Sequence, residues 1–404
     1  MIIRARVVVT MDGLPIDNGA VAVSGGCIAD VGKFPEISAR HGGERIVDLS
    51  GQALLPGLIN AHCHLDYTCL RGKISRRKSF TDWIRAINAE KAKLSPENYV
   101  ASIRGGFAEA KQFGTTTIAN LTAFPELVSR IQAPIRTWWF AELIDARDPT
   151  RANEIIDLAV EKLKAAEHWG LAPHAPFTAS ANVYRRCDEI ARREKVLLTT
   201  HLAESHEEMS LFRDASGPLY DFLKEIGRDM NDCGEQTPFG QFVGRLRDAS
   251  LPDWLLVHLN EVLDGDLRAL AKQSTQSNVV HCPRSHAYFG HSPFQFEKFR
   301  ELGFNVCLGT DSLASNEDLS LFAEMRAFQK EFPNVSPEEL LKMVTVNSAY
   351  ALHQENALGK IRSEFLADLI AVPYARSTSV FDELVAFDRP VSWSMIGGQV
   401  QNSA

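Results

Sequence analysis

The sequence predicts an α/β protein built on a (β/α)8 TIM-type barrel, with a small β-sandwich formed by the N- and C-terminal segments. Apolar runs of strand length alternate with longer helical segments between residues 54 and 353, and β-like sequence lies on both sides of this region. Such alternation over this length favours a closed parallel barrel over a doubly wound sheet. No GxGxxG or GxxxxGK[ST] motif follows a predicted strand, so the usual signals of dinucleotide and P-loop folds are missing.

The two ends of the chain are predicted to form one unit. Residues 1–53 contain three valine- and isoleucine-rich runs punctuated by glycine, and the tail returns to β character in LADLIAVPYA and VSWSMIGGQV. We therefore expect residues 1–53 and 354–404 to build a composite β-sandwich, and residues 54–353 to build the barrel.

Eight strands are expected in the barrel region: Leu54 to Asn60, Thr115 to Asn120, Ile135 to Glu142, Gly170 to Pro173, Val196 to His201, Leu255 to His258, Asn278 to His281 and Asn305 to Gly309. Helices are expected between them. A capping serine, followed by proline or by a glutamate at capping-box spacing, marks three helix starts at Ser95, Ser205 and Ser336.

Composition and charge restrict the class of protein. Of 404 residues, 45% are hydrophobic and 23% are charged, which is typical of a soluble globular protein. The formal net charge of -8 argues against nucleic acid as a partner, and no apolar stretch is long enough to cross a membrane. The basic run from Arg71 to Lys78 is more typical of a solvated loop than of a site for an anionic substrate.

Cysteine usage indicates a reducing compartment. The seven cysteines are dispersed without a CxxC pair, and the first residues lack the pattern of a signal peptide. We therefore expect a cytoplasmic location. We also expect a homodimer, which is the commonest oligomer among soluble proteins.

The predicted strand ends are rich in histidine and acidic residues. In a (β/α)8 barrel, functional groups lie at the carboxyl ends of the strands. Here those ends carry His62, His64, His174, His201, Glu204, His258, His281, His286 and Asp311. Alternate residues of a strand point the same way, so the HxH pair at 62 and 64 can face one ion. Taken alone, that pair is equally consistent with a loop, but packing does not explain so many ionisable groups at one rim.

Three imidazoles and a carboxylate suit Zn²⁺ or Fe²⁺, with one position left for water. A bound divalent cation lowers the pKa of that water from about 15.7 to about 7. Glu204 lies three residues after His201 and is expected to reach this water as a general acid and base without binding the metal.

The motifs NAHCHLD, THLAE, VH and GTDS, in this order, resemble the amidohydrolase superfamily, specifically its mononuclear cytosine/adenosine-deaminase-like branch. The resemblance covers essentially the whole chain. It implies one divalent metal ion, Zn²⁺ first and Fe²⁺ as the alternative, with Glu204 as proton shuttle, His258 as a hydrogen-bonding partner of water or substrate, and Asp311 as a second proton acceptor. The implied metal ligands are His62, His64, His201 and Asp311. His174 stands where binuclear members carry a carboxylated lysine, so a single metal is expected.

Further motifs are similar to aminofutalosine deaminases and methylthioadenosine/S-adenosylhomocysteine deaminases: NAHCHLDYTCLRG, FTDWI, APHAPFTAS and HCPRSH. This similarity implies removal of the exocyclic amine of an aminopurine nucleoside by attack of metal-bound hydroxide. The expected substrate contacts are Trp83, His174, Arg284 and His286. The last motif departs from the common PxSN pattern, because His286 replaces the asparagine, and this leaves the exact substrate open.

Two other functions remain open. One is deamination or dechlorination of another heteroaromatic ring, such as guanine, a pterin or an s-triazine. The other is a non-catalytic scaffold, which the retained site residues disfavour. The remaining candidates are expected to be structural or solvated: His281 inside its strand, Trp138 and Trp139 in the core or the pocket wall, and the solvated histidines His41, His168, His206, His291 and His353.

Overall fold

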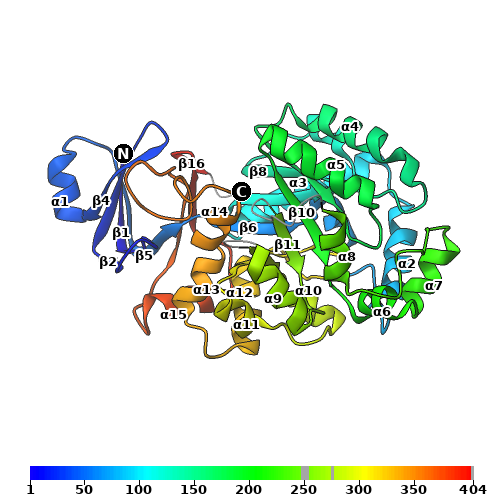
Figure 1. The fold of residues 1–404 in the computed structure, drawn as a ribbon. Coiled ribbons are helices and arrows are strands. Elements are labelled where there is room, and N and C mark those ends of the chain that lie inside the picture. The colour runs from blue at the N-terminus through cyan, green and yellow to red at the C-terminus, as the bar shows by residue number, and fades with distance from the viewer. Residues whose placement is uncertain (247–253, 274–276, 402–404) are drawn as a thin grey trace.

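The computed structural model of the chain describes residues 1–246, 254–273 and 277–401. Figure 1 shows two parts, a barrel surrounded by helices and a sheet beside it that contains both ends of the chain. The predicted fold class is confirmed. Among the described residues, no helix combines the length and apolar character that a membrane crossing requires.

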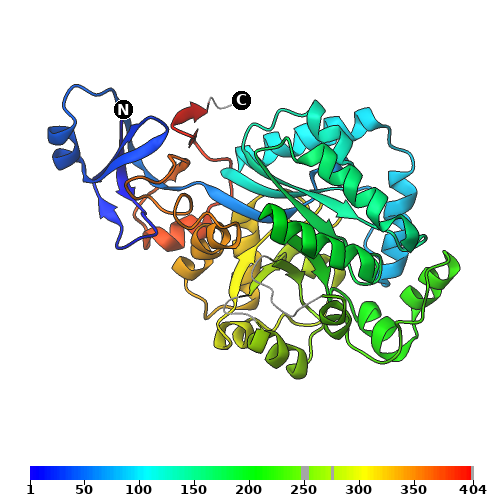
Figure 2. The same cartoon turned by 45° about the horizontal axis from the view of Figure 1, so that its top comes forward.

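Eight parallel strands form the barrel in chain order: β6 (Leu58–Cys63), β7 (Thr115–Thr122), β8 (Arg136–Leu143), β9 (His168–Pro173), β10 (Leu197–Leu202), β11 (Trp254–His258), β12 (Asn278–His281) and β13 (Asn305–Leu308). Most of their residues are buried, as expected for parallel strands covered on their outer face. The helices lie around this wall of strands in Figure 2: α2 (Phe80–Lys91), α3 (Pro96–Gln112), α4 (Ala152–Leu163), α5 (Ala181–Glu194), α6 (His206–Asp214), α7 (Pro218–Glu225), α8 (Pro238–Arg245), α9 (Asp264–Gln273), α10 (Pro283–Phe289), α11 (Phe296–Glu301), α12 (Leu321–Glu331), α13 (Pro337–Met343) and α14 (Val346–Ala351).

The helix starts follow the predicted caps. At the start of α3, the Ser95 hydroxyl oxygen accepts a hydrogen bond from the N–H of Asn98. The side-chain oxygen of Asn98 accepts one in turn from the N–H of Ser95. Ser205 and Ser336 cap α6 and α13 in the same way through their side-chain oxygens. These caps satisfy N–H groups that the first turn of a helix leaves without an intrahelical partner.

The terminal segments form a second sheet, in the order β16-β15-β14-β5-β1-β3-β4, with β2 paired to β1. Its strands are β1 (Ile2–Val8), β2 (Ile16–Asp17), β3 (Gly19–Ser24), β4 (Cys27–Lys33), β5 (Ile46–Pro56), β14 (Leu369–Pro373), β15 (Trp393–Ile396) and β16 (Gln399–Gln401), with α1 (Phe34–Arg40) and α15 (Val380–Ala386) as its helical segments. Strand β14 runs antiparallel to β5, and Ile370 pairs with Leu55. The two ends of the chain therefore share one hydrogen-bonded sheet.

The passage from the terminal sheet into the barrel lies at Gly57. The apolar run that begins at Leu54 is divided there, because its first three residues complete β5 and the barrel strand begins at Leu58 rather than at Leu54. A Cβ on Gly57 would lie 2.1 Å from the Thr116 hydroxyl oxygen. This position therefore accommodates no side chain, and the bend between the two sheets depends on glycine.

The barrel closes where β13 meets β6. The N–H groups of Thr310 and Asp311 donate to the carbonyl oxygen of His62 at 3.0 and 3.1 Å, and Cys63 pairs with Asp311 in an isolated parallel bridge. A Cβ on Gly309 would lie 2.7 Å from the same carbonyl oxygen and 2.9 Å from the His62 Cβ. The close approach of the two strands therefore requires glycine at position 309.

We expect Gly309→Ala to lower the free energy of unfolding by about 1 to 3 kcal/mol, because the added methyl group overpacks a contact formed by backbone atoms. Urea denaturation measures the change. Gly51→Ala is the control, since a Cβ at Gly51 meets no atom within 4 Å. Equal stability of the two variants would contradict the importance of this contact.

Candidate metal centre and its cavity

The structure brings the four predicted metal ligands together. Ligand nitrogens of His62, His64 and His201 lie within 4.8 Å of one another, and the Nε2 atoms of His64 and His201 are 3.2 Å apart. Asp311 Oδ1 lies 3.8 Å from the Nε2 atoms of both His62 and His64. The end of β6, strand β10 and the residues after β13 thus converge on one point of the barrel.

Local backbone geometry explains this convergence. At the end of β6, side chains alternate, so the rings at 62 and 64 face the centre while the Cys63 thiol donates in another direction, to Asn120 Oδ1 at 3.5 Å. Asp311 has a φ of 56°, in the left-handed region that non-glycine residues rarely adopt. Its carboxylate is fixed by the Ser285 hydroxyl at 2.6 Å and by the Ser312 N–H at 2.8 Å. Strained backbone of this kind is concentrated at functional sites.

The donor set suits a cation. His62 is fully buried, and neither of its ring nitrogens has a hydrogen-bond partner among the described residues. Burial, followed by repulsion from His62, lowers the pKa of His201 to about 4. Burial and the same neighbour also hold the pKa of His64 well below its usual value. Neutral imidazoles are the form that binds a metal, so the lowered pKa values of His64 and His201 and the partnerless ring nitrogens of His62 suit a divalent ion.

Asp311 provides the negative charge of this group. Burial by itself would raise the pKa of its carboxyl, but the surrounding imidazoles outweigh burial and hold that pKa well below the usual range. A carboxylate among imidazoles matches the ligand types that Zn²⁺ prefers.

Glu204 lies directly after β10, and its side chain is buried beside the predicted ligands. Its Oε1 is 3.7 Å from His258 Nε2. Burial, followed by repulsion from Asp311 and Glu208, raises the pKa of Glu204 well above its usual value. A raised pKa is what a carboxyl needs in order to exchange a proton as a general acid and base near neutral pH.

The backbone of Glu204 is held from two sides. Its N–H donates to Glu208 Oε2 at 2.8 Å, and its carbonyl oxygen accepts from Asn260 Nδ2 at 3.0 Å. The predicted capping box is therefore only half formed. Ser205 caps α6 as expected, but the Glu208 carboxyl binds the N–H of residue 204 instead of returning to Ser205.

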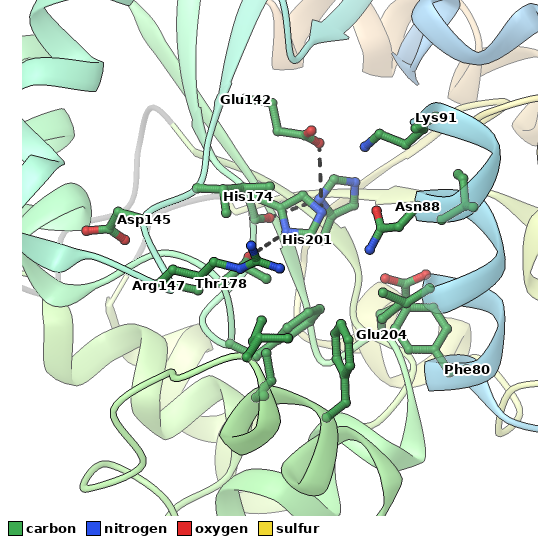
Figure 3. A pocket seen from close by; sticks show the side chains of 18 of the residues that line it. Phe80, Asn88, Lys91, Glu142, Asp145, Arg147, His174, Thr178, His201 and Glu204 are labelled. Atoms are coloured by element: carbon green, nitrogen blue, oxygen red, sulfur yellow. Dashed lines mark hydrogen bonds and ion pairs between the residues drawn. The ribbon is translucent and has the colours of Figure 1, made fainter. Parts of the chain in front are cut away.

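A cavity of about 400 Å³ opens above these residues. Its apolar wall is formed by Phe80, Trp83, Ile84, Ile87, Phe177, Phe222, Leu223 and Ile226. Figure 3 shows Asn88 and Lys91 on α2 at one side and Asp145 with Arg147 at the other, with His174 and His201 between them. The cavity has the size and the mixture of apolar and polar groups that small-molecule sites have.

The chain matches the model of the amidohydrolase family over residues 53–400. The chain belongs to this family. A curated relative from Syntrophobacter fumaroxidans, 5-methylthioadenosine/S-adenosylhomocysteine deaminase, is 31% identical, with 90% of this chain and 82% of the relative covered. Membership of the family also confirms the predicted enzyme class, a hydrolase acting on carbon–nitrogen bonds other than peptide bonds.

Solved structures share the whole fold of this amidohydrolase. A zinc-bound adenosine deaminase from Xanthomonas campestris superposes with a TM-score of 0.83 at 23% identity, covering 99% of this chain and 92% of the other. Aminofutalosine deaminase of Helicobacter pylori in complex with methylthio-coformycin gives a TM-score of 0.85 at 21% identity, covering 99% and 100%. At these identities the likeness supports the barrel and the terminal sheet.

Four residues were expected to contact the substrate, and two of them line the cavity. Trp83 and His174 belong to its lining. Arg284 and His286 are not among the described lining residues. Arg284 forms ion pairs with Asp318 at 2.6 Å and with Glu317 at 3.0 Å, so its charge is already balanced.

Glu142 was missed as a site residue, although it ends the third predicted strand. Its Oε1 lies 3.8 Å from His64 Nδ1 and 3.8 Å from His174 Nε2, between a predicted ligand and a predicted substrate contact. Burial raises the pKa of Glu142, and the Lys91 ammonium opposes that increase. Because Glu142 is the last residue of its predicted strand, the strand-end rule that selected Glu204 and Asp311 would also have found it.

Two of the five histidines expected to be solvated are not, and that prediction was wrong for them. His168 begins β9, and its ring stacks on Trp138 with the centroids 3.9 Å apart. His291 is largely withdrawn from water, and burial lowers its pKa to about 3.

Trp138 and Trp139 are buried in the core, as predicted. The basic run is a loop that is mostly exposed, also as predicted.

We expect Ser285→Ala to weaken zinc binding by about 10- to 100-fold, the usual effect of removing a partner that orients a ligand. The variant loses the hydrogen bond to Asp311 Oδ2 and leaves the overall fold intact. Competition with a chromogenic chelator measures the affinity. Ser348→Ala is the matched control, because this buried hydroxyl donates to a backbone carbonyl of α13, at Met343. Equal affinities in the two variants would contradict the role of Ser285.

The metal-free protein is expected to lose stability as the pH falls from about 6.5 to about 4. In this range the unfolded chain binds a proton at His201, whose ordinary pKa is 6.5, while the folded chain does not until the pH approaches 4. His201→Gln removes this contribution. Melting temperatures between pH 7.5 and 5 test the expectation: the parent should lose more stability than the variant, and parallel pH profiles would contradict it.

Proposed function

We propose that the protein is a metal-dependent deaminase that hydrolyses the exocyclic amine of an aminopurine nucleoside. One observation carries this proposal: three imidazoles and a carboxylate converge beside the buried Glu204, whose pKa is raised, in a single cavity. The deaminase name of the relative at 31% identity supports the same reaction.

One divalent cation would be held by His62, His64, His201 and Asp311, with zinc as the first choice and iron as the alternative. When bound, it would supply Lewis-acid chemistry and a water molecule activated as the nucleophile. The partnerless ring nitrogens of His62 are the observation of this chain that supports the assignment. His174, a neutral residue at the end of β9, supports one metal rather than two.

The remaining residues move and hold protons. Glu204 would accept the proton that the attacking water releases and deliver it to the ring nitrogen beside the carbon that loses the amine. His258, whose Nε2 lies 3.7 Å from Glu204 Oε1, would keep that carboxyl directed at the reacting atoms. Asp311 would accept a second proton and pass it to the departing ammonia.

The cavity supports a substrate with an apolar ring and a polar substituent. Its aromatic and aliphatic wall, with Trp83 and Phe177, suits a purine ring, which it would shield from water. Polar groups lie at two opposite sides of the cavity, with Asn88 and Lys91 on α2 at one side and Arg147 at the other. By the names of the relatives, we propose methylthioadenosine, S-adenosylhomocysteine, aminofutalosine or adenosine as the substrate.

We propose a cytoplasmic location. All seven cysteines are free thiols, which supports the location expected from the sequence. A small molecule is the proposed partner. The homodimer stays a prediction.

We expect Glu204→Gln to retain zinc and to lower deamination by roughly 100-fold or more, because the amide cannot shuttle the proton. Zinc content and ammonia release measure the two effects separately. The exposed Glu167→Gln serves as the control and should match the parent. Parent-like turnover by Glu204→Gln would remove this residue from the mechanism, whereas loss of zinc would assign it to the metal site.

The substrate class is tested on the parent enzyme loaded with zinc. Ammonia release is measured with each proposed nucleoside and with guanine as separate substrates. Turnover of one or more nucleosides at a kcat/KM at least tenfold above that for guanine is the expected result. Preference for guanine, or chloride release from a chlorinated s-triazine, would overturn the nucleoside assignment.

A further inference from the structure

A second group of metal-binding side chains lies outside the cavity. His281, His286 and Glu331 offer ligand atoms that lie within 4.8 Å of one another. They come from the end of β12, from α10 and from the end of α12. Of the described residues that line the cavity, none belongs to this group.

His281 is the member that packing alone does not explain. Its side chain has no exposed surface, and its ring stacks on Phe294 with the centroids 3.9 Å apart. Neither ring nitrogen has a hydrogen-bond partner among the described residues. A buried polar group without a partner costs about 1 to 3 kcal/mol, which a hydrophobic side chain at the same place would avoid. Burial also holds the pKa of His281 well below its usual value, so the ring is neutral.

His286 is oriented as a metal ligand would be. Its Nε2 donates to the carbonyl oxygen of Ser292 at 2.9 Å, which fixes the tautomer and leaves a lone pair on Nδ1. This Nδ1 lies 4.0 Å from Glu331 Oε2. Histidines that bind metals typically donate their other ring N–H to a carbonyl or a carboxylate in this way.

An ion pair between His286 and Glu331 accounts for only part of the arrangement. The 4.0 Å separation is longer than a hydrogen bond, and the pair leaves both nitrogens of His281 without a partner. A cation among the three groups would be bound by one nitrogen of His281, by Nδ1 of His286 and by the Glu331 carboxylate. The Glu331 side chain is 33% exposed, which gives an ion a route from solvent.

We propose that His281, His286 and Glu331 form a second divalent-cation site, with Zn²⁺ as the preferred ion. Two imidazoles and one carboxylate, completed by water, are an established ligand set for zinc. Ligands at about 2.0 to 2.2 Å from a tetrahedral ion lie roughly 3.3 to 3.6 Å apart, so a small movement of the partly exposed glutamate closes the site.

A cation here would fasten two helices to a strand. It would join α12 and α10 to the end of β12, and α10 also carries Ser285, whose hydroxyl fixes Asp311. The second site would therefore stabilise the helix that orients one of the proposed ligands of the first. Its role is structural, and its existence does not depend on the proposed reaction.

The test counts zinc ions in protein that has been stripped with a chelator and titrated with ZnCl₂. Isothermal titration and elemental analysis should show one ion fewer per chain in His286→Gln and in Glu331→Gln than in the parent. Glu301→Gln is the control for the loss of one acidic group at the end of a helix, because Glu301 ends α11 and is exposed. His64→Gln, in the cavity, should lose the other ion.

Zinc should also raise the melting temperature of the His64→Gln protein, where the second site is the one left intact. This increase should disappear when Glu331→Gln is added. An unchanged zinc count in both His286→Gln and Glu331→Gln would overturn the proposal. Because Glu331 is partly exposed at a helix end, its substitution is expected to leave the fold intact, so the result is decisive even if a variant at the buried His281 does not fold.

Discussion

The contact between β6 and β13 is the constraint on which the rest of the structure depends. The His62 carbonyl oxygen accepts from two successive N–H groups, those of Thr310 and Asp311, while the ring of the same residue points into the ligand cluster. One residue thus closes the barrel with its backbone and contributes to the proposed metal centre with its side chain. Gly309 makes this possible, because any side chain there would meet the same carbonyl. The same contact therefore closes the barrel and positions a proposed metal ligand.

Burial at this seam has opposite effects on acids and bases. It favours the neutral form of each group, so it lowers the pKa values of His64 and His201 and raises the pKa of Glu204. Asp311 stays charged, because the imidazoles around it outweigh burial. The metal-free centre therefore carries desolvated polar atoms and a buried carboxylate, which is destabilising. A divalent cation would balance that charge and give the ring nitrogens a partner, which links metal binding to folding stability.

The sequence was sufficient where one physical rule decides the outcome. Runs of apolar residues located the barrel strands. The rule that functional groups follow the strands gave nine candidates, and the family resemblance selected the four proposed ligands from among them. It was insufficient where two rules compete. The run after Leu54 reads as one strand, but Gly57 divides it between two sheets because Thr116 leaves no space there. The spacing of Ser205 and Glu208 predicts a capping box, but the Glu208 carboxylate accepts a hydrogen bond from the buried N–H of Glu204 instead.

The motif HCPRSH shows why spacing alone misplaces a side chain. Ser285 and His286 are adjacent in α10, and successive residues of a helix point about 100° apart. Ser285 therefore reaches Asp311 in the proposed centre, whereas His286 turns away toward Ser292 and His281. A residue directly after a strand end is directed by the strand, but one several positions later is directed by the helix that has already begun. One side of α10 therefore contacts Asp311 through Ser285, and another side contacts His281 at the end of β12 through His286. The orientation of Asp311 thus depends on how α10 packs against β12.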